Sequence, residues 1–122
     1  KTAVRAYLDS KGIFTNIRED YGPDIQSWLN ISHEVEIKSS WEDEWPAIWS
    51  TVHIPYRKKK YLDSSRRIMF WVLNRDCTKA WHIDGKYMKE EYVRNIPNRR
   101  YPDGEDFYDI PIKLCKLIEV AI

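Results

Sequence analysis

Acidic and basic side chains alternate with apolar ones in the stretch Glu34-Val35-Glu36-Ile37-Lys38. If this stretch is a β-strand, Val35 and Ile37 point to one face, and Glu34, Glu36 and Lys38 point to the other. The apolar face belongs in a core, while the opposite face presents two carboxylates and an ammonium in a row. Such a row is suited to binding a divalent cation and to stabilising negative charge that develops on a substrate.

Asp24 supplies a further carboxylate for this candidate site. It follows Pro23, which presets the backbone at the start of a short strand expected over residues 25–29. A turn at residues 30–33 would close a hairpin and bring Asp24 beside Glu36. Two carboxylates from adjacent strands form an oxygen-rich site suited to Mg²⁺, and a neighbouring lysine can orient or activate water.

The pair Pro23-Asp24, followed by Glu36-Ile37-Lys38, resembles the signature of the PD-(D/E)xK phosphodiesterase superfamily, the restriction-endonuclease-like nucleases and resolvases. The resemblance covers the middle third of the chain closely and the rest only through the order of the expected elements. It implies an α/β fold with a restriction-endonuclease-like mixed β-sheet flanked by helices. It also implies a Mg²⁺-dependent nuclease, with Mn²⁺ able to substitute, that hydrolyses DNA phosphodiester bonds.

The resemblance also implies a role for each residue of the motif. Asp24, Glu36 and Lys38 would be the catalytic residues. Asp24, Glu36 and the main-chain carbonyl of Ile37 would bind the metal, and Lys38 would orient or activate the attacking water. Glu34, on the same expected strand face, would support the metal ligands. DNA is therefore the expected partner, and a homodimer is left open.

The sequence leaves open which further carboxylates complete the predicted metal site. Residues 2–11 have apolar side chains at helical spacing, and Gly12 is placed to end that helix. In the family, the first helix often carries a glutamate that reaches the metal, and this helix has none. Either the missing glutamate lies before Lys1, or the protein functions without it. Glu19 and Asp20, in the loop after the first expected strand, are further carboxylates that we rank below the Pro-Asp pair.

Basic residues gather in two segments. The first is the run Arg57, Lys58, Lys59 and Lys60, expected on a helix where the family places its second one. Consecutive residues on a helix cannot all face one way, so we expect only part of this run to contact phosphate. A solvated charged face is the alternative interpretation. Arg99 and Arg100, in a long loop expected over residues 95–105, are further candidates for holding the nucleic-acid backbone.

Tryptophan recurs every four residues at Trp41, Trp45 and Trp49. One interpretation is packing in or over the core, because tryptophan buries a large area. The other is a stacking platform for unpaired bases. Two alternatives to the nuclease follow from the chain as a whole. One is a catalytically inactive nucleic-acid-binding module on the same fold, and the other is a protein-interaction domain that uses this tryptophan-rich segment.

The chain as a whole is typical of one globular domain over residues 1–122, and its start at Lys1 leaves a truncated N-terminus open. A net charge of +1 argues against a purely electrostatic coat for nucleic acid. Two distant cysteines without a CxxC motif favour a reducing, cytoplasmic location. No stretch is apolar enough to predict a membrane span, so no membrane partner is expected.

Three further elements complete the predicted order. The apolar run at residues 68–73 predicts a central strand buried on both faces. Residues 79–87 predict a second strand nearer an edge, and Pro111 is expected to begin a C-terminal helix. The histidines His33, His53 and His82 have no ligand spacing and are expected on the surface.

Overall fold

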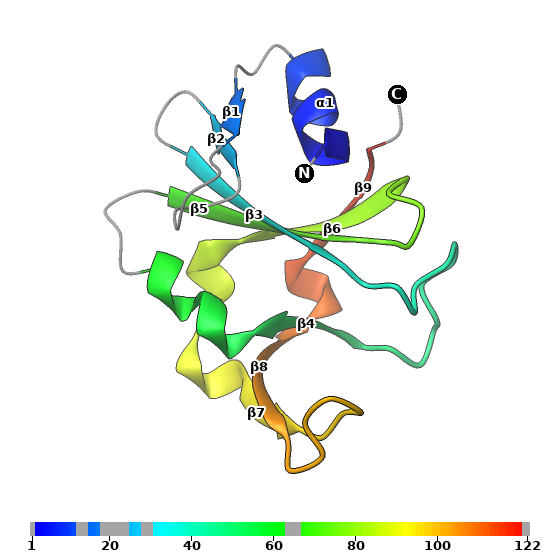
Figure 1. Cartoon of the computed structure of the whole chain (residues 1–122), viewed down its shortest axis with the longest axis vertical. Helices are drawn as coiled ribbons and strands as arrows, with labels where there is room; N and C mark the ends of the chain where they lie inside the picture. The colour runs from blue at the N-terminus through cyan, green and yellow to red at the C-terminus, as the bar shows by residue number, and fades with distance from the viewer. Residues whose placement is uncertain (1, 12–14, 18–24, 28–30, 63–66, 121–122) are drawn as a thin grey trace.

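The computed structural model describes residues 2–11, 15–17, 25–27, 31–62 and 67–120, and has a mixed α/β architecture made mostly of strands. Figure 1 shows three layers: one helix, a six-stranded sheet in the middle, and a three-stranded sheet below it. The elements, in chain order, are α1 (Thr2–Ser10), β1 (Thr15–Ile17), β2 (Ile25–Ser27), β3 (Ile31–Ile37), β4 (Thr51–Pro55), η2 (Tyr56–Tyr61), β5 (Arg67–Leu73), β6 (Lys79–Asp84), η3 (Gly85–Tyr87), η4 (Glu90–Tyr92), β7 (Val93–Ile96), β8 (Glu105–Pro111), η5 (Ile112–Leu114) and β9 (Lys116–Glu119). The four η segments are 3₁₀-helices.

The large sheet has the strand order β1-β2-β3-β5-β6-β9. Neighbours pair antiparallel except β3 and β5, which are parallel. A parallel pair needs a crossover connection, and here that connection contains β4 and η2. The crossover therefore carries the chain to the small antiparallel sheet, β4-β8-β7, and brings the basic segment η2 to β3, where Lys58 contacts Glu34 and Glu36.

The central strand β5 is buried on both faces, as its apolar run predicts. Because side chains alternate along a strand, Ile68, Phe70 and Val72 face the small sheet, while Trp71 and Leu73 face α1. The larger core between the two sheets consists of Trp41, Val52, Ile54, Ile68, Phe70, Val72, Trp81, Ile83, Met88, Tyr108 and Ile110. A smaller core under α1 contains Val4, Leu8, Trp71, Leu73, Ala80 and Val120.

The predicted faces of β3 need correction. The strand begins at Ile31, so residues 31–33 belong to it and do not form the expected turn. Glu34 is only 3% exposed, whereas the supposedly buried Ile37 is 55% exposed. The reason is tertiary: Lys58 of η2 covers Glu34, whereas Glu36 keeps 34% of its side chain exposed.

His33 lies in the interior, so the prediction of a surface position is wrong. Its Nδ1 accepts a hydrogen bond of 3.0 Å from Nε1 of Trp71. Burial, and then the neighbouring His82, lower the pKa of His33 to about 4. The ring is therefore neutral at neutral pH, as an acceptor nitrogen requires.

The predicted C-terminal helix is wrong. Strand β8 runs to Pro111, a single 3₁₀ turn follows, and β9 pairs antiparallel with β6, with Leu117 opposite Trp81. The free edge of β6 offers hydrogen-bonding groups that a helix would leave unpaired. The expected long loop is also shorter, because residues at both ends of 95–105 join the β7–β8 hairpin.

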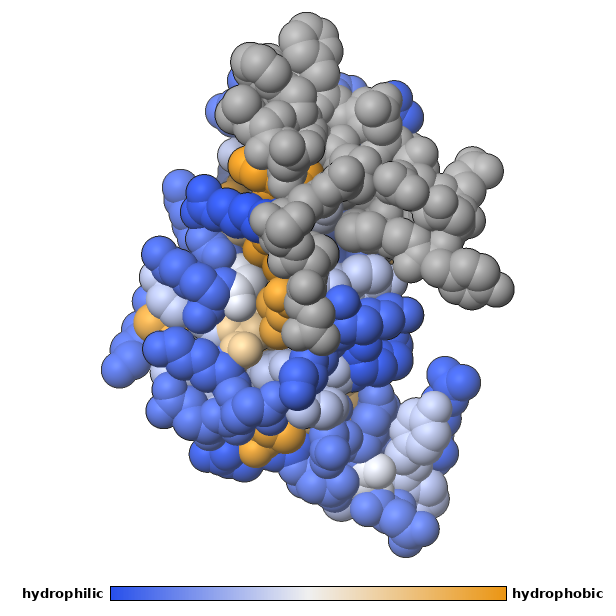
Figure 2. All heavy atoms as spheres, turned by 90° about the vertical axis from the view of Figure 1, so that its left-hand side faces the viewer, coloured by the Kyte–Doolittle hydropathy of each residue, from blue (hydrophilic) through white to orange (hydrophobic). Residues whose placement is uncertain are grey.

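The apolar side chains are gathered mainly in the two cores, and the face seen in Figure 2 is mainly hydrophilic. Figure 2 shows mainly hydrophilic residues over the described part of one face, with small hydrophobic patches between them. Cys77 and Cys115 are both free thiols. In the part of the chain that the structure describes, no helix is long and apolar enough to cross a membrane.

Candidate active site

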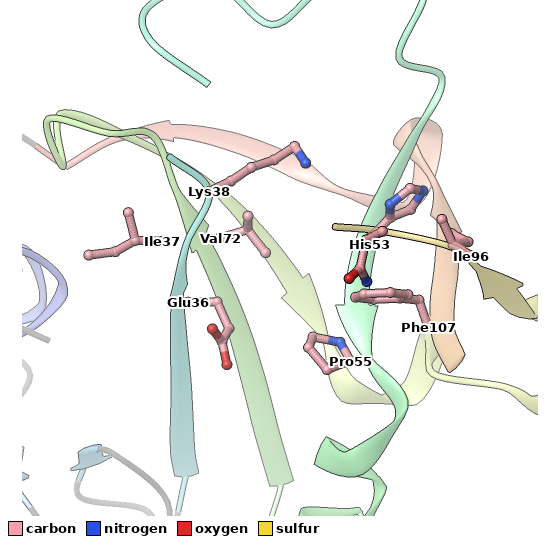
Figure 3. A pocket seen from close by; sticks show the side chains of 9 residues that line it. Glu36, Ile37, Lys38, His53, Pro55, Val72, Ile96 and Phe107 are labelled. Atoms are coloured by element: carbon pink, nitrogen blue, oxygen red, sulfur yellow. The ribbon is translucent and has the colours of Figure 1, made fainter. Parts of the chain in front are cut away.

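A cleft of about 280 Å³ separates the end of β3 from the small sheet. Figure 3 shows the two walls facing each other: Glu36, Lys38 and Val72 on one side, and residues of β4, β7 and β8 on the other. The second wall consists of His53, Pro55, Ile96 and Phe107, with Asn98 beside them. Charged groups and apolar rings therefore share one opening, which is typical of a ligand site.

Lys38 lies one residue beyond β3, yet its position is well defined by the main chain. Its N–H donates to the Leu73 carbonyl (2.8 Å), and its carbonyl accepts from the Trp41 N–H (3.0 Å). The Trp41 carbonyl in turn accepts from the Arg75 N–H at 2.7 Å. The turn after β5 thus holds the chain that follows Lys38, so the ammonium extends across the cleft from a rigid base.

The carboxylates of Glu34 and Glu36 converge on one cation, the ammonium of Lys58. Lys58 forms an ion pair with Glu34 and a second one with Glu36 (2.9 Å), and Arg57 lies 3.7 Å from Glu36. Lys58 is only 8% exposed. Burial alone would lower the pKa of Lys58, but hydrogen bonds to Glu34 and Glu36 outweigh it and raise the pKa. Lys58, the third residue of η2, therefore points inward and neutralises the buried glutamate.

Lys38 differs from the other cations around the cleft. Within the described residues, no carboxylate lies at ion-pair distance from its ammonium, which instead stands 5.0 Å from the ring centre of Trp49. Burial lowers the pKa of Lys38. A half-buried ammonium without an anionic partner is electrostatically incomplete, so an anionic ligand would be attracted to this position.

His53 faces the cleft from β4 and pairs with Asp109 of β8, its direct cross-strand neighbour. The distance from His53 Nε2 to Asp109 Oδ1 is 3.0 Å. Burial lowers the pKa of His53, Asp109 opposes that effect, and the nearby Lys38 adds to it. Sequence reasoning assigned this histidine to the surface without a role. Only the register between β4 and β8 brings the pair together, so no local pattern could have revealed it.

The structure brings part of the predicted catalytic set into the cleft. Glu36, Ile37 and Lys38 all line it, and Figure 3 shows the Ile37 side chain directed away from the opposite wall. Strand β2 pairs with β3 from Ile25, opposite His33, onward. Asp24 lies outside the described residues. Among the residues that are described, no group of three or more histidine, cysteine, aspartate or glutamate side chains is arranged to hold a metal ion.

The predicted nucleic-acid-binding residues occupy different environments. Lys58 is internal, as described above. Lys59 forms an ion pair with Glu90 at 3.0 Å, and hydrogen bonds to Tyr56 and then Glu90 raise its pKa. Arg57 and Lys60 are exposed.

The second basic segment, Arg99 and Arg100, lies in the loop of the β7–β8 hairpin. Arg99 and Arg100 are exposed and directly follow Asn98, which lines the cleft. The guanidinium of Arg100 stands 5.5 Å from the ring centre of Tyr101. A phosphate contact stays a prediction for both arginines.

The tryptophans pack on one another over the larger core. Trp41 is fully buried, and Trp45 meets both Trp41 and Trp49 edge-to-face at 5.1 Å between ring centres. The packing interpretation is confirmed for Trp41. Trp45, Ile48 and Trp49 also line a second cleft of about 390 Å³, which shares Lys38 and His53 with the first.

Comparisons with known proteins add no relative: no family model, no curated protein and no solved structure matches this chain. Function must therefore be inferred from the cleft itself.

Proposed function

We propose that the chain is a metal-dependent nuclease of the PD-(D/E)xK type that hydrolyses DNA phosphodiester bonds. One observation supports this proposal above the others. Glu36 and Lys38, two residues apart at the end of β3, line the same cleft. A carboxylate that can ligate a metal and an ammonium that can stabilise phosphate charge are the groups that such a hydrolysis requires.

The order of elements also supports the proposal. Helix α1, the antiparallel strands β1 to β3, strand β4, the helical segment η2 and strand β5, which is parallel to β3, follow one another along the chain. Apart from the inserted β4, this is the order expected from the family resemblance up to β6. The small sheet and the C-terminal strand are additions to it, and the small sheet forms the second wall of the cleft.

The residues present suit a hard divalent cation. Glu34 and Glu36 already direct carboxylate oxygens at a single cation, the Lys58 ammonium, and oxygen is the ligand that Mg²⁺ prefers. Asp24, Glu36 and the Ile37 carbonyl would hold Mg²⁺, or Mn²⁺ in its place. Such an ion, when bound, lowers the pKa of coordinated water and neutralises charge on the phosphate.

The chain's own groups would bind and orient the phosphodiester. Lys38 would hold a phosphate oxygen, and because the ammonium is half-buried its attraction is screened less than at the open surface. Phe107 and Ile96 on the opposite wall would exclude water from that contact. The ammonium would also stabilise the negative charge that grows during the attack of water on phosphorus.

The decisive experiment is cleavage of a panel of labelled DNA and RNA substrates (duplex, flap, junction and single strand) with Mg²⁺ or Mn²⁺ and with EDTA. We expect metal-dependent cleavage that EDTA stops and that Glu36→Gln abolishes. Glu119→Gln, an exposed glutamate on β9, is the matched control and should cleave normally. Cleavage that persists in EDTA, or in Glu36→Gln, would reject the assigned site.

One observation favours a second candidate, a nucleic-acid-binding module without catalysis. Lys58 already neutralises the carboxylates that a metal would need, and Lys38 remains available to phosphate. Such a module would retain DNA in EDTA and would not cleave it with any divalent ion. The same substrate panel, assayed for binding as well as cleavage, separates the two functions.

A further inference from the structure

Two clefts meet at Lys38 and His53, which line both of them. On one side lie Phe107 and Ile96, and on the other lies Trp49. Figure 3 shows the Lys38 side chain extending from β3 toward the strand that carries His53. The Lys38 ammonium therefore stands between two compartments, each with an aromatic ring in its wall.

The charge at the junction is available to a ligand. The two cations of η2 nearest Glu36 have carboxylate partners: Lys58 pairs with Glu34 and Glu36, and Arg57 lies 3.7 Å from Glu36. Lys38 has none among the described residues. A ligand that completes this arrangement carries a negative charge at its centre and apolar, flat groups on both sides.

The two compartments have room for such groups, with volumes of about 280 and 390 Å³. Ile48, at the rim of the second cleft, is 87% exposed, and its neighbour Trp49 is only partly buried. An isolated exposed aliphatic residue needs no explanation, but here it shares a cleft with an aromatic ring and with the Lys38 ammonium, which no carboxylate of the described residues pairs with. Nucleic-acid bases pack against aromatic side chains, and backbone phosphates pair with lysine.

We propose that the two clefts bind two neighbouring nucleotides of an unpaired nucleic-acid strand, with the linking phosphate at Lys38. One base packs against Trp49 and Ile48, and the next packs against Phe107 and Ile96. In a duplex the faces of the bases are stacked on each other and unavailable, so the arrangement selects single-stranded segments. This inference deepens the proposed function by naming the form of its substrate, and it rests on that proposal for the choice of nucleic acid as ligand.

The test measures binding alone, in EDTA, so that neither metal nor cleavage is needed. Fluorescence anisotropy follows a labelled oligothymidylate of about 10 nucleotides and a hairpin duplex of the same length. We expect the single strand to bind at least about tenfold more tightly than the duplex. A labelled oligouridylate reports which sugar is preferred, and tighter binding than the duplex by either single strand supports the proposal.

Variants locate the contact. Trp49→Leu and Phe107→Leu should each weaken binding of the single strand by about 5- to 150-fold, the loss of one base–aromatic contact, without changing duplex binding. Ile48→Ser should weaken it less. Leu117→Ser, an exposed aliphatic on β9, is the matched control and should bind normally. Should Trp49→Leu fail to fold in a thermal scan, Ile48→Ser and Phe107→Leu carry the test.

Two results would overturn the inference: a duplex bound as tightly as the single strand, or folded cleft variants that bind like wild type. These differ from failure of the nuclease proposal. Tight single-strand binding with no cleavage under any divalent ion would reject the nuclease and keep the clefts as a strand-binding site. Cleavage of duplex DNA without binding of single strands would support the nuclease and reject the clefts as a strand-binding site.

Discussion

At the scale of single residues, the two lysines near Glu36 have opposite surroundings. Lys58 is buried between two carboxylates, whereas Lys38 has no carboxylate partner in the described part of the chain and faces two clefts. The difference explains why one lysine is expected to support the fold and the other to contact substrate. The role of Lys38 is tested by DNA cleavage, and that of Lys58 by the free energy of unfolding.

Replacing Lys38 should affect chemistry more than stability. In Lys38→Ala, DNA cleavage at saturating substrate should fall by about 10²-fold or more, the usual effect of losing one preorganised charge at a transition state. The melting temperature should stay close to that of wild type, because Lys38 forms no ion pair with any residue that the structure describes. Lys116→Ala, on the exposed part of β9, is the matched control. An unchanged cleavage rate in Lys38→Ala would show that the wrong lysine has been assigned.

Replacing Lys58 should affect stability first. Lys58→Met leaves the buried Glu34 without this cation, and breaking a buried ion pair from one side costs about 3–5 kcal/mol. Urea unfolding measures that loss. Lys60→Met, two residues further along η2 and exposed, should change the free energy of unfolding by no more than about 0.5 kcal/mol. Equal stability of the two variants would contradict the internal role of Lys58.

At the scale of elements, the large sheet contains two histidines that resist protonation. Burial first, and then neighbouring cations, lower the pKa of His82 to about 4, although Asp84 opposes this. Burial, with a contribution from His82, does the same for His33. Trp71 lies between them: it donates to His33 and its ring centre is 4.3 Å from that of His82.

Stability should therefore fall as the pH falls from about 6.5 to about 4. In that window His33 and His82 bind protons in the unfolded chain but stay neutral in the folded sheet, so protonation favours unfolding. Urea unfolding at several pH values measures the slope, and His82→Gln should reduce it. His53→Gln, on the small sheet, should reduce it less, because Asp109 partly offsets the effect of burial there. A stability that stays constant across the window would contradict burial of neutral rings.

The close contact between η3 and β5 permits only glycine at position 85. A Cβ there would lie 2.6 Å from Cγ2 of Ile68 and 2.8 Å from its carbonyl oxygen. Because the carbonyl belongs to the central strand, it cannot move away cheaply. We expect Gly85→Ala to lower the free energy of unfolding by about 1–3 kcal/mol. Lys86→Ala, the exposed neighbour, should leave urea unfolding almost unchanged, and equal effects of the two changes would refute the close packing.

At the scale of the whole molecule, a net charge of +1 conceals an uneven distribution of free cations. Lys58 and Lys59 are engaged by glutamates, so within this basic run we expect the exposed Arg57 and Lys60 to reach phosphates outside the cleft. Each true phosphate contact steepens the dependence of log K on log salt by about 0.7 units for single strands and about 0.9 for duplex DNA.

Salt titrations can count those contacts. Lys60→Ala should flatten the salt slope of DNA binding by about one contact, whereas Lys58→Arg should leave it unchanged because that side chain is internal. Binding is measured at several salt concentrations in Ca²⁺ or with Glu36→Gln, so that no cleavage occurs. Identical slopes for Lys60→Ala and wild type would move the backbone contact elsewhere, with Arg99 and Arg100 next to be tested.

Local patterns in the sequence determined the elements whose stability comes from their own periodicity. Apolar residues at helical spacing predicted α1, and the uninterrupted run at residues 68–73 predicted β5 as a strand buried on both faces. Alternation likewise predicted that Glu36 and Lys38 share a strand face, and both line the cleft. These predictions succeeded because side-chain direction within one element depends only on backbone geometry.

Contacts between distant segments decided the rest. The C-terminal segment has a helical pattern, yet it forms β9 because the edge of β6 was open to pairing. Lys58 points inward because β3 places Glu34 beneath η2, and His53 meets Asp109 because β4 and β8 pair in that register. Each outcome depends on a partner many residues away. Propensity and periodicity describe one element at a time, so the walls of the cleft, and the lysine left available within it, follow only from the packing of the two sheets.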